Sequence, residues 1–519
     1  MFKHAQLETV KAWIALPANS AMPLHARIQR AIRQLIIDGA LSSGRPLPAS
    51  RMLAKSLQVS RDTVEAAYTQ LHAEGFIDRR VGSGSFVAEM SELQSHQCSQ
   101  NRAVPTRNPG KLSRRGVVMA RNGGVREASF PRPFAPGVPE TRAFPLALWE
   151  RLERQVRKEY GVQTLAHGDP QGSERLRKAV ADYVNLERGA RATAEQVLIL
   201  TSSQQALSLC ANVLFDPGDR IFIEDPAYHG ARKAFEAAGL ECVPVRVDEN
   251  GLVVEEMLGS DVQTKAVFLT PSHQFPTGAT LSLERRLSII EWARKNQTWV
   301  IEDDYDSEFH YAGKPTACVQ GLDAGEQTIY IGTFTKSLFP GLRIGYVVLP
   351  RALVQPMTSA RTLLDGHSAL TSQLTLARFM EGGHFGAYVR TMRILYAKRL
   401  SILTDLISKH LSEYMTANVP AGGLQLACTL TGSFSETSVI EAGRRAGIDL
   451  LGLSPLYMSD RAPAGILVGF AAYTPGELEG TVKKLAISLE NMTMNSSRSE
   501  VSDDWSAIDD KIGRRVRTK

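Results

Sequence analysis

The stretch IGTFTKSLFPGLRIGY, residues 331–346, places one lysine among hydroxyl side chains, directly after an apolar run that reads as a strand. Thr333 and Thr335 precede Lys336, and Arg343 follows seven residues after the lysine, beyond a Pro-Gly turn. A lone lysine is usually a solvated surface charge, because burying an ammonium group is costly. The apolar run and the hydroxyls favour a position inside a site, so the rest of the chain must indicate what that site holds.

Four other strand-like runs in the same region also end in polar clusters. From about residue 130 to 350, short β-branched runs alternate with helical patterns, which is typical of a mostly parallel sheet in an α/β domain. The runs are QVLIL, RIFIE, KAVFLT, WVIE and IYIG, and polar residues follow each of them. Ligands of open α/β sheets lie outside the carboxyl ends of the strands. The pattern therefore predicts one shared site at that edge.

The first cluster and the arginine suit a phosphate group. Thr201 to Gln204 lead directly into the helical pattern QQALSLCANVLF, so free backbone N–H groups and the hydroxyls of Ser202 and Ser203 would lie at a helix N-terminus. Arg343 can add a bidentate contact to the same phosphate.

The remaining clusters suit a heteroaromatic ring. Tyr228 offers an aromatic plane, Asp303 can hold a ring nitrogen protonated, and Tyr305 can donate to a ring oxygen. Lys336 becomes a nucleophilic amine when it is desolvated beside cationic groups. A phosphate, a protonated pyridine nitrogen and an imine-forming lysine together describe pyridoxal 5′-phosphate (PLP).

Simpler interpretations exist for each cluster taken alone. The acidic stretch IEDDYDSEFH lacks the spacing and the central glycine of a calcium loop, so no metal site is predicted. His273, in the cluster after KAVFLT, joins the predicted cofactor-binding set, although an isolated histidine is more often structural. Only the joint pattern argues for a cofactor.

The N-terminal region predicts a second kind of function. Ile28, Ile32, Leu35 and Ile36 form one apolar helix face, and a short helix with Met52, Leu53 and Leu57 follows. After a tight turn at Gln58–Val59, Ser60 can cap a third helix that buries Val64, Ala67, Tyr68 and Leu71. The stretch GFIDRRVGSGSFVAE then reads as two strands joined by a Gly-Ser-Gly turn. This order predicts a winged helix-turn-helix.

In that geometry the start of the third helix enters the major groove of DNA. Arg61 and Thr63 would then reach base edges, whereas Arg51, Arg79 and Arg80 would lie nearer the phosphates. The alternative is a small helical domain with a solvated basic face. The predicted DNA-binding set is Arg51, Ser60, Arg61, Thr63, Arg79, Arg80 and Gly82.

Composition and segment boundaries agree with a soluble protein of several domains. The 519 residues carry a net charge of +6, 43% of them are hydrophobic, and the five cysteines are scattered without CxxC spacing. We find neither a signal peptide nor an apolar run long enough for a membrane, and expect a cytoplasmic protein. The predicted parts are a winged helix-turn-helix (15–90), a linker (91–130), a large PLP-binding α/β domain (131–385), a smaller α+β domain (386–490) and a polar tail (491–519).

Two sets of motifs resemble one protein family. LPASRMLAKSLQVSRDTVEAAYTQLHAEGFI resembles the winged-helix reader of GntR-type transcription regulators. TPSHQFPTG, IEDDYDSEF and GTFTKSLFPGLRIGY resemble fold-type-I aminotransferases, in the versions carried by MocR-type regulators, which fuse both parts. The resemblance covers about residues 20 to 485. It implies that Lys336 forms a Schiff base with PLP, and that the other cofactor-binding residues are Ser202, Ser203, Gln204, Tyr228, His273, Asp303, Tyr305, Thr333, Thr335 and Arg343.

The sequence also departs from that family. Aminotransferases of this fold bind the substrate α-carboxylate with an arginine on a late strand, and its place falls on Leu467. Gly230 stands where a GABA-responsive relative has an arginine, and His167 where a tyrosine is common near the partner subunit's phosphate. Phe275 replaces an asparagine, a change that MocR-type relatives share. Efficient transamination needs an oriented substrate, so the two lost arginines disfavour turnover unless Arg232, Arg361 or another arginine substitutes for them.

Three functions follow from these observations. The first is a homodimeric, head-to-tail transcription regulator that binds operator DNA and whose PLP domain senses an amine, an amino acid or PLP itself. The second is an active aminotransferase with a DNA-binding appendage, which the lost arginines disfavour and the intact Lys336–Asp303–Tyr305 set favours. The third, a DNA-binding protein with a cofactor-free scaffold, is the weakest, because the residues for phosphate and Schiff base are present.

Overall fold

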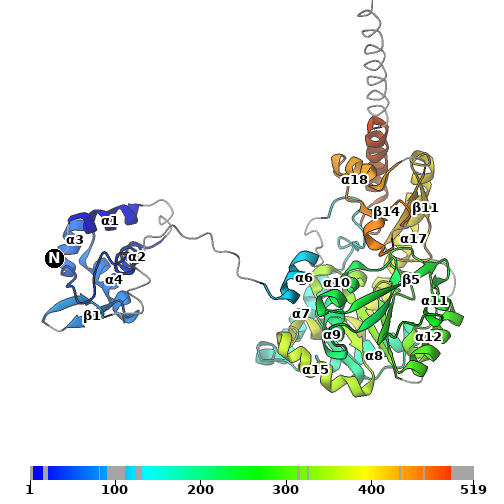
Figure 1. The fold of residues 1–519 in the computed structure, drawn as a ribbon, viewed down its shortest axis with the longest axis horizontal. Coiled ribbons are helices and arrows are strands. Elements are labelled where there is room, and N and C mark those ends of the chain that lie inside the picture. The colour runs from blue at the N-terminus through cyan, green and yellow to red at the C-terminus, as the bar shows by residue number, and fades with distance from the viewer. Residues whose placement is uncertain are drawn as a thin grey trace, which may run out of the picture. The chain divides into compact units, whose positions relative to one another are not determined.

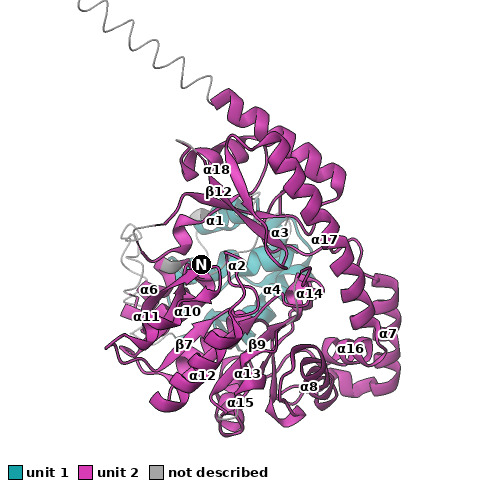
Figure 2. Ribbon diagram, turned by 90° about the vertical axis from the view of Figure 1, so that its right-hand side faces the viewer, with its two compact units in different colours: residues 1–111 teal, residues 112–519 magenta. Residues whose placement is uncertain are grey.

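The computed structural model describes residues 4–15, 22–80, 82–89, 112–123, 131–312, 316–323, 326–431, 434–459 and 462–492. The chain divides into two compact units, residues 1–111 and residues 112–519, which are called here the N-terminal and C-terminal units (Figure 2). The predicted linker at 91–130 falls largely outside the described residues, and so does the predicted tail beyond residue 492.

The N-terminal unit is a helical domain with a two-stranded hairpin (Figure 1). The predicted apolar faces of its second and fourth helices are buried, and they form one core with Leu53 and Ile77. Val10 of the first helix, which the sequence analysis left outside the domain, is also buried in this core. Its elements are α1 (His4–Ala15), α2 (Leu24–Ile37), α3 (Ser50–Leu57), α4 (Arg61–Ala73), β1 (Ile77–Arg80) and β2 (Gly84–Val87).

The turn between α3 and α4 has the predicted form. Gln58 ends α3 in the left-handed conformation, with φ +56°. The side chain of Ser60 accepts a hydrogen bond from the backbone N–H of Thr63 and thereby caps α4. Met52, which the sequence assigned to the apolar face of α3, is 65% exposed, because this helix of eight residues buries only a narrow face with Leu53 and Ala54.

The C-terminal unit is built on an eight-stranded, mostly parallel sheet, in the order β3-β10-β9-β8-β7-β4-β5-β6. The exceptions are β10, which runs antiparallel to both neighbours, and β6, which is antiparallel to β5. The five runs that precede polar clusters are β3, β4, β7, β8 and β9, and their carboxyl ends share one edge of the sheet. The strands are β3 (Val197–Leu200), β4 (Arg220–Asp225), β5 (Glu241–Asp248), β6 (Gly251–Leu252), β7 (Ala266–Leu269), β8 (Trp299–Asp304), β9 (Thr328–Thr333) and β10 (Gly345–Val348).

Helices cover both faces of this sheet, because its strands are apolar on both sides. In β3, Leu198 and Leu200 face one core, whereas Val197 and Ile199 face another. The first core lies under α9 (Ser203–Leu214), α10 (His229–Ala238) and α15 (Arg351–Asp365). The helices on the other face are α7 (Leu146–Tyr160), α8 (Glu174–Arg188), α11 (Val254–Leu258), α12 (Leu283–Asn296), α13 (Val319–Leu322) and α16 (Leu370–Glu381).

A smaller α+β part follows, as the sequence predicts. Its antiparallel sheet has the order β11-β12-β14-β13 and packs against the long helix α17. A further helix runs from residue 475 to residue 492. The other elements of this part are α17 (His384–His410), β11 (Met415–Asn418), β12 (Gln425–Leu430), α18 (Glu436–Arg445), β13 (Leu451–Gly452) and β14 (Gly465–Gly469).

One helix lies where the sequence predicts only linker. α6 (Arg114–Asn122) belongs to the C-terminal unit and lies beside α10 (Figure 1). Arg115 of α6 donates a hydrogen bond to the backbone oxygen of Ala237, at 3.1 Å, and another to the side chain of Asn212. Short turns complete the unit: α14 (Phe334–Ser337), η2 (Gly161–Leu165), η3 (Ala194–Gln196), η4 (Pro340–Leu342) and η5 (Ser454–Leu456).

Within the described ranges, no helix is both long and apolar enough to cross a bilayer.

Candidate functional site

Lys336 lies in the short helix α14, directly after strand β9. The side chain of Thr333 caps this helix by accepting a hydrogen bond from the backbone N–H of Thr335. Nζ of Lys336 donates a hydrogen bond of 3.0 Å to the backbone oxygen of Gly137. Gly137 has φ +69°, and a Cβ atom there would lie only 3.2 Å from Nζ. A glycine distant in sequence therefore provides both the space for the lysine and its acceptor.

The neighbouring strand β8 ends in a buried acid. Asp303 is 3% exposed, and its Oδ1 atom has no hydrogen-bond partner among the described residues. Burial, and then the carboxyl groups of Asp304, Asp306 and Glu224, raise the pKa of Asp303 to about 8, while Lys336 acts in the opposite direction. Without a cationic partner this carboxyl group holds a proton at neutral pH. A protonated ring nitrogen would satisfy the unpaired oxygen and favour the charged form.

The acids around Asp303 are held in two different ways. Asp304 is paired with Arg188 at 2.8 Å and accepts from the hydroxyl of Tyr330 at 2.6 Å. Burial alone would raise the pKa of Asp304, but these partners bring it below its usual value. Glu224 has only uncharged partners, among them the hydroxyl of Thr270 at 2.7 Å, and burial raises its pKa to about 7.

A set of aromatic side chains that includes Tyr305 lies beside Asp303 and Asp306. The hydroxyl of Tyr305 is 3.1 Å from Nδ1 of His273, and the same nitrogen is 3.1 Å from Oδ1 of Asp306. The ring of Phe275 contacts those of Tyr228 and Tyr305, with centroids 5.5 and 6.2 Å apart. His273 therefore fixes the orientation of Tyr305.

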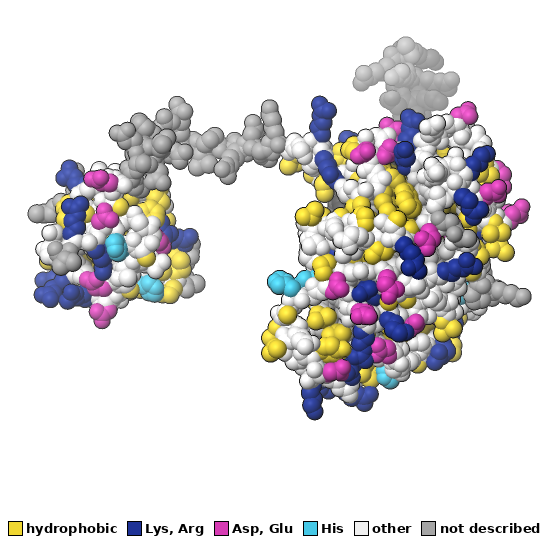
Figure 3. Space-filling model, turned by 90° about the horizontal axis from the view of Figure 1, so that it is seen from below, with side chains coloured by type: hydrophobic (Ala, Val, Ile, Leu, Met, Phe, Trp, Pro, Cys, Tyr) yellow, Lys and Arg dark blue, Asp and Glu magenta, His cyan; other side chains and the backbone are white. Residues whose placement is uncertain are grey.

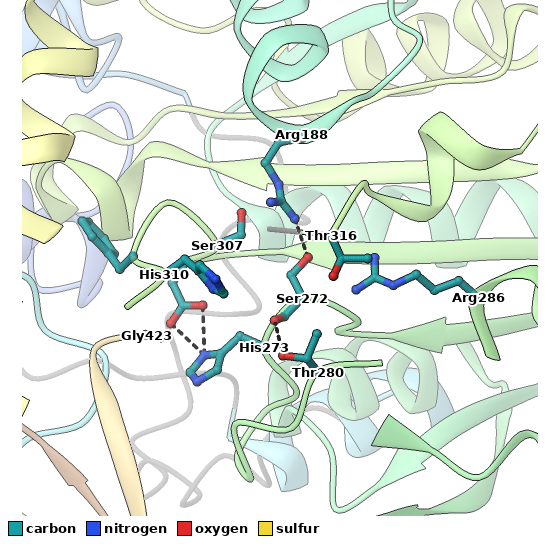
Figure 4. A pocket seen from close by; sticks show the side chains of 11 residues that line it. Arg188, Ser272, His273, Thr280, Arg286, Ser307, His310, Thr316 and Gly423 are labelled. Carbon is teal, nitrogen blue, oxygen red and sulfur yellow. Dashed lines mark hydrogen bonds and ion pairs between the residues drawn. The ribbon is translucent and has the colours of Figure 1, made fainter. Parts of the chain in front are cut away.

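A small polar pocket opens on the other side of His273 (Figure 4). Arg188 reaches into it and donates to the hydroxyl of Ser272 at 2.5 Å, and His273 points toward the carboxylate of Asp306. Arg286 reaches the pocket from helix α12, and its guanidinium donates to three backbone carbonyl oxygens. Both arginines are thus engaged by protein groups. Arg188, which also pairs with Asp304, holds that acid in place beside Asp303.

The predicted phosphate-binding residues converge around one glycine. Gly345 of β10 pairs with Leu200 of β3 and with Thr333 of β9. A Cβ atom on Gly345 would lie 3.1 Å from the backbone of Ser202, so the starts of α9 and α14 approach each other here. The side chain of Ser202 caps α9, and Ser203 is its first residue.

Two further polar side chains at this point have no protein partner. Oγ1 of Thr335 is buried and without a hydrogen bond among the described residues. Arg343 is exposed, has φ +53°, and makes no ion pair or side-chain hydrogen bond within those residues. A hydroxyl, a free guanidinium and the N-terminus of a helix of twelve residues are suited to an anion.

Gln204 lies on the Tyr228 side of this cluster. Its Nε2 donates to the backbone oxygen of Gly230 at 2.9 Å, and its Oε1 is buried without a partner among the described residues. A Cβ atom on Gly230 would lie 2.5 Å from the ring of Tyr228 and 2.6 Å from Oε1 of Gln204. The glycine at position 230 is thus required by the packing of these two side chains.

The position of the expected carboxylate arginine is apolar, and one of the two candidate substitutes is engaged elsewhere in the protein. Leu467 is fully buried in an apolar cluster with Ala427, Leu453 and Leu456. Arg361 is also fully buried, and it donates to Ser368 and to backbone oxygens.

Arg232 remains near the site but has long contacts with other groups. It lies 3.4 Å from the backbone oxygen of Tyr457, 3.5 Å from that of Pro455 and 3.8 Å from the carboxylate of Glu236. His167, which the sequence places near a partner subunit, approaches His367 at 3.3 Å.

The predicted DNA-binding residues are in the N-terminal unit, at the start of α3, at the start of α4 and on the hairpin. Arg51, Arg61, Arg79 and Arg80 are exposed, and Lys and Arg side chains stand on the face of this unit seen in Figure 3. Arg79 pairs with Glu65 of α4 at 2.8 Å, and this ion pair ties the hairpin to the helix.

Three of the predicted DNA-binding residues have specific local partners. Ser60 and Thr63 share a hydroxyl contact of 2.7 Å. Arg80 stacks over the ring of Phe86, with its guanidinium carbon 5.0 Å from the centroid. Gly82 has φ +78° in the hairpin turn.

Two residues of the site were missed by the sequence analysis. Gly137 accepts from Lys336, and Gln425 of β12 lies against the same glycine, with Oε1 3.5 Å from a Cβ built there. The Pro-Gly pair at 136–137 predicts a turn but not its partner, and Gln425 follows no motif. In the part of the chain that is described, no group of three or more His, Cys, Asp or Glu side chains could hold a metal ion.

The site has the donors and acceptors that PLP requires. Asp303 has an unpaired buried oxygen for a ring nitrogen, and Tyr228 and Tyr305 provide an aromatic and a hydroxyl contact. Oγ1 of Thr335, in α14, has no partner among the described residues, and the side chain of Arg343 makes no hydrogen bond or ion pair with them, so both can engage a phosphate. The residues therefore fit the cofactor, and Lys336 is the amine among them.

Comparison with protein families identifies both units. Residues 24–87 match the family of bacterial regulatory proteins called gntR, and residues 147–427 match aminotransferase class I and II. The chain is similar to a probable rhizopine catabolism regulatory protein, MocR, of Rhizobium meliloti, with 32% identity over 91% of this chain and 95% of that protein. It is also similar to PdxR, a pyridoxine biosynthesis transcriptional regulator of Corynebacterium glutamicum, with 30% identity over 92% of this chain and 98% of that protein.

Solved structures support the fold of the C-terminal unit. Kynurenine aminotransferase of Pyrococcus horikoshii superposes with a TM-score of 0.65 and 23% identity, covering 77% of this chain and 98% of the enzyme. At this identity the likeness concerns the fold alone, and it confirms the predicted fold-type-I aminotransferase architecture.

Proposed function

Because the chain belongs to the family of GntR-type transcription regulators that carry an aminotransferase-like domain, we propose that its C-terminal unit binds PLP at Lys336 and uses it to sense a small molecule. The sensed molecule is an amine, an amino acid or PLP itself, and its binding changes how the winged helices engage operator DNA. The observation that carries the proposal is the buried, unpaired Oδ1 of Asp303, placed in the same site as Lys336.

Each part of the cofactor has a group to receive it. Asp303 accepts from the ring nitrogen, Tyr228 packs on the ring, and Tyr305, oriented by His273, donates to the ring oxygen. When bound, PLP supplies an aldehyde carbon that condenses reversibly with primary amines. The phosphate is held by Arg343 and by the group at the starts of α9 and α14: Ser202, Ser203, Gln204, Thr333 and Thr335.

The arrangement favours sensing over turnover. A transaminase must orient its substrate as well as bind it, and an arginine that grips the α-carboxylate normally does so. Here that position is Leu467, in an apolar cluster, and Arg361 is committed to backbone oxygens and Ser368. A bound amino acid would therefore be held mainly through its amine.

The N-terminal unit supplies the DNA contacts. Arg61 and Thr63 at the start of α4 read base edges, and the hairpin residues Arg79, Arg80 and Gly82 contact the backbone, as does Arg51. We further propose a cytoplasmic homodimer in a head-to-tail arrangement. In such a dimer, a change in the C-terminal units alters the spacing of half-sites that the two winged helices can span.

The test uses DNA fragments selected from a random-sequence pool by the full-length protein. The affinity for the selected DNA is measured by fluorescence anisotropy, with and without added PLP, for the wild type, Lys336→Ala and the control Lys295→Ala. Lys295 is an exposed lysine on α12. We expect PLP to change the affinity of the wild type and the control at least threefold and to leave Lys336→Ala unchanged. Equal effects on all three proteins, or no effect on any of them, would contradict the proposal.

A further inference from the structure

One polar side chain of the small domain reaches the lysine site. Gln425 begins strand β12, and its Oε1 lies against Gly137, the residue whose backbone oxygen accepts from Lys336. A carbon built on Gly137 would be 3.2 Å from Nζ of the lysine and 3.5 Å from Oε1 of the glutamine. Lys336 and Gln425 therefore converge on the same point, although they come from different domains.

The amide of Gln425 has no protein partner there. The residue is 4% exposed, and no other described residue forms a hydrogen bond with its side chain. A side-chain amide that is not engaged by the described residues can exchange its remaining contact with water for a hydrogen bond to a ligand. The amide of Gln425, which lies against the same glycine as Lys336, is therefore available for a ligand.

The surroundings of this amide are apolar. Alternate residues of a strand face the same side, so Ala427 lies next along β12 from Gln425 on that face. Ala427 is paired with Leu467 of β14, and Leu467 with Leu451 of β13. Phe275 and Tyr457 pack on the same apolar cluster.

The charged side chains near this apolar cluster are an acid, Asp225, and an arginine, Arg232, that has contacts with other groups. Asp225 lies at its edge, where its carboxylate accepts from the backbone N–H groups of Met458 at 2.7 Å and Ser459 at 3.2 Å. Arg232 is shared between Glu236 and two backbone oxygens. Among the described residues, an added carboxylate would find an apolar wall and an acid here.

We propose that Gln425 selects the effector, and that the effector is a primary amine carrying an uncharged hydrogen-bonding group, an amide or a hydroxyl, in place of a carboxylate. The inference rests on the proposed function, because the amine is recognised at Lys336 only when PLP is bound. The amide of Gln425 donates to or accepts from the uncharged group, and the Leu467 cluster packs on its carbon skeleton. An arginine in this place would instead select amines that carry a carboxylate.

The experiment titrates the PLP-loaded, full-length protein with four small amines and follows its visible absorption band. L-alaninamide, L-alaninol and L-alanine share a carbon skeleton and differ in the polar group, and isopropylamine lacks that group. Because the amines differ in basicity, the decisive quantity is the change in half-saturation for each ligand between wild type and variant. The variants are Gln425→Ala and Gln425→Arg, with Gln425→Met as a replacement of similar volume if the alanine variant does not fold.

We expect the wild type to respond to alaninamide and alaninol at concentrations about 10-fold lower than to alanine. Gln425→Ala should weaken the responses to the amide and the alcohol about 10-fold and leave isopropylamine within about twofold. Gln425→Arg should shift the preference toward alanine. Stronger binding of alanine to the wild type, or an unchanged preference in the alanine variant, would overturn the inference alone. The absence of any band after PLP is added would instead overturn the proposed function, and this inference with it.

Discussion

Replacing Asp303 by asparagine should change stability and cofactor binding in opposite directions. The folded chain without cofactor keeps this carboxyl protonated, because burial and three neighbouring acids raise its pKa from 3.8 to about 8. The unfolded chain has lost that proton at pH 7. One pKa unit corresponds to about 1.4 kcal/mol, so holding the proton at pH 7 costs the folded state about 4 kcal/mol.

An asparagine removes this cost because it does not ionise. Its own buried amide is incompletely paired, which costs about 1–3 kcal/mol. The net result is a cofactor-free protein that is more stable at pH 7, by about 1–3 kcal/mol. At pH 5 the cost of the proton is below about 2 kcal/mol, so the gain should disappear. The sign follows because the pKa of Asp303 is higher in the folded chain than in the unfolded chain. The contribution of this carboxyl group to stability is therefore fully present below pH about 4 and is lost as the pH rises through about 8.

The same change should weaken PLP binding. The charge-assisted hydrogen bond between the ring nitrogen and the carboxylate of Asp303 is lost, which is worth about 1.5–3 kcal/mol, or roughly 10- to 100-fold in affinity. The assay combines chemical denaturation of the cofactor-free protein at pH 5 and pH 7 with a PLP titration followed by absorbance.

Asp304→Asn is the matched control, on the same strand. Asp304 pairs with the buried Arg188, so this variant leaves an uncompensated charge and should lose about 3–5 kcal/mol. The reasoning would be refuted if Asp303→Asn destabilised the cofactor-free protein at pH 7, or if it bound PLP as tightly as the wild type.

Three further predictions follow. Gly230→Arg should lower the thermal midpoint and the PLP affinity and should not create a carboxylate clamp, because its Cβ would displace the ring of Tyr228; a variant with wild-type PLP affinity and improved binding of amino acids would contradict this. Arg80→Ala should weaken DNA binding about equally for all sequences and reduce the slope of log affinity against log salt by about 1, measured by anisotropy at several salt concentrations; a changed sequence preference would instead assign Arg80 to base contacts. The cofactor-free wild type should lose thermal stability as the pH rises from about 5 to about 9, because burial raises the pKa of four acids to about 7 or 8: Glu224, Glu302, Asp303 and Glu308. A thermal midpoint that rises over this pH range would contradict this prediction.

Local patterns were sufficient to predict much of the architecture. The spacing of Val64, Ala67, Tyr68 and Leu71 predicted the buried face of α4, because a single amphipathic helix shows its period directly in the sequence. The polar clusters after five apolar runs predicted a common edge. The sheet order confirms that edge, since all five strands are parallel to one another.

Features that depend on distant segments could not be predicted in this way. Strand β10 is buried on both faces, so it is apolar at every position and its sequence does not indicate the direction in which it runs. Its antiparallel position between β3 and β9 could therefore not be predicted. Gly137 contacts Lys336 and lies against Gln425, and these three residues are about 90 to 200 residues apart in the sequence. From the sequence, Gly230 is interpreted as the loss of an arginine that a relative has at this position. The structure shows a packing reason for the glycine, because Tyr228 and Gln204 leave no space for a side chain there.

The central claim is that Lys336 holds PLP, and the most direct test identifies the modified residue. The purified full-length protein is incubated with PLP, reduced with borohydride, digested and examined by peptide mass spectrometry. We predict that the pyridoxyl group is found on the peptide containing Lys336, and that it is absent from the Lys336→Ala variant. Modification of a different lysine, or an unmodified Lys336 peptide after reduction, would contradict the account.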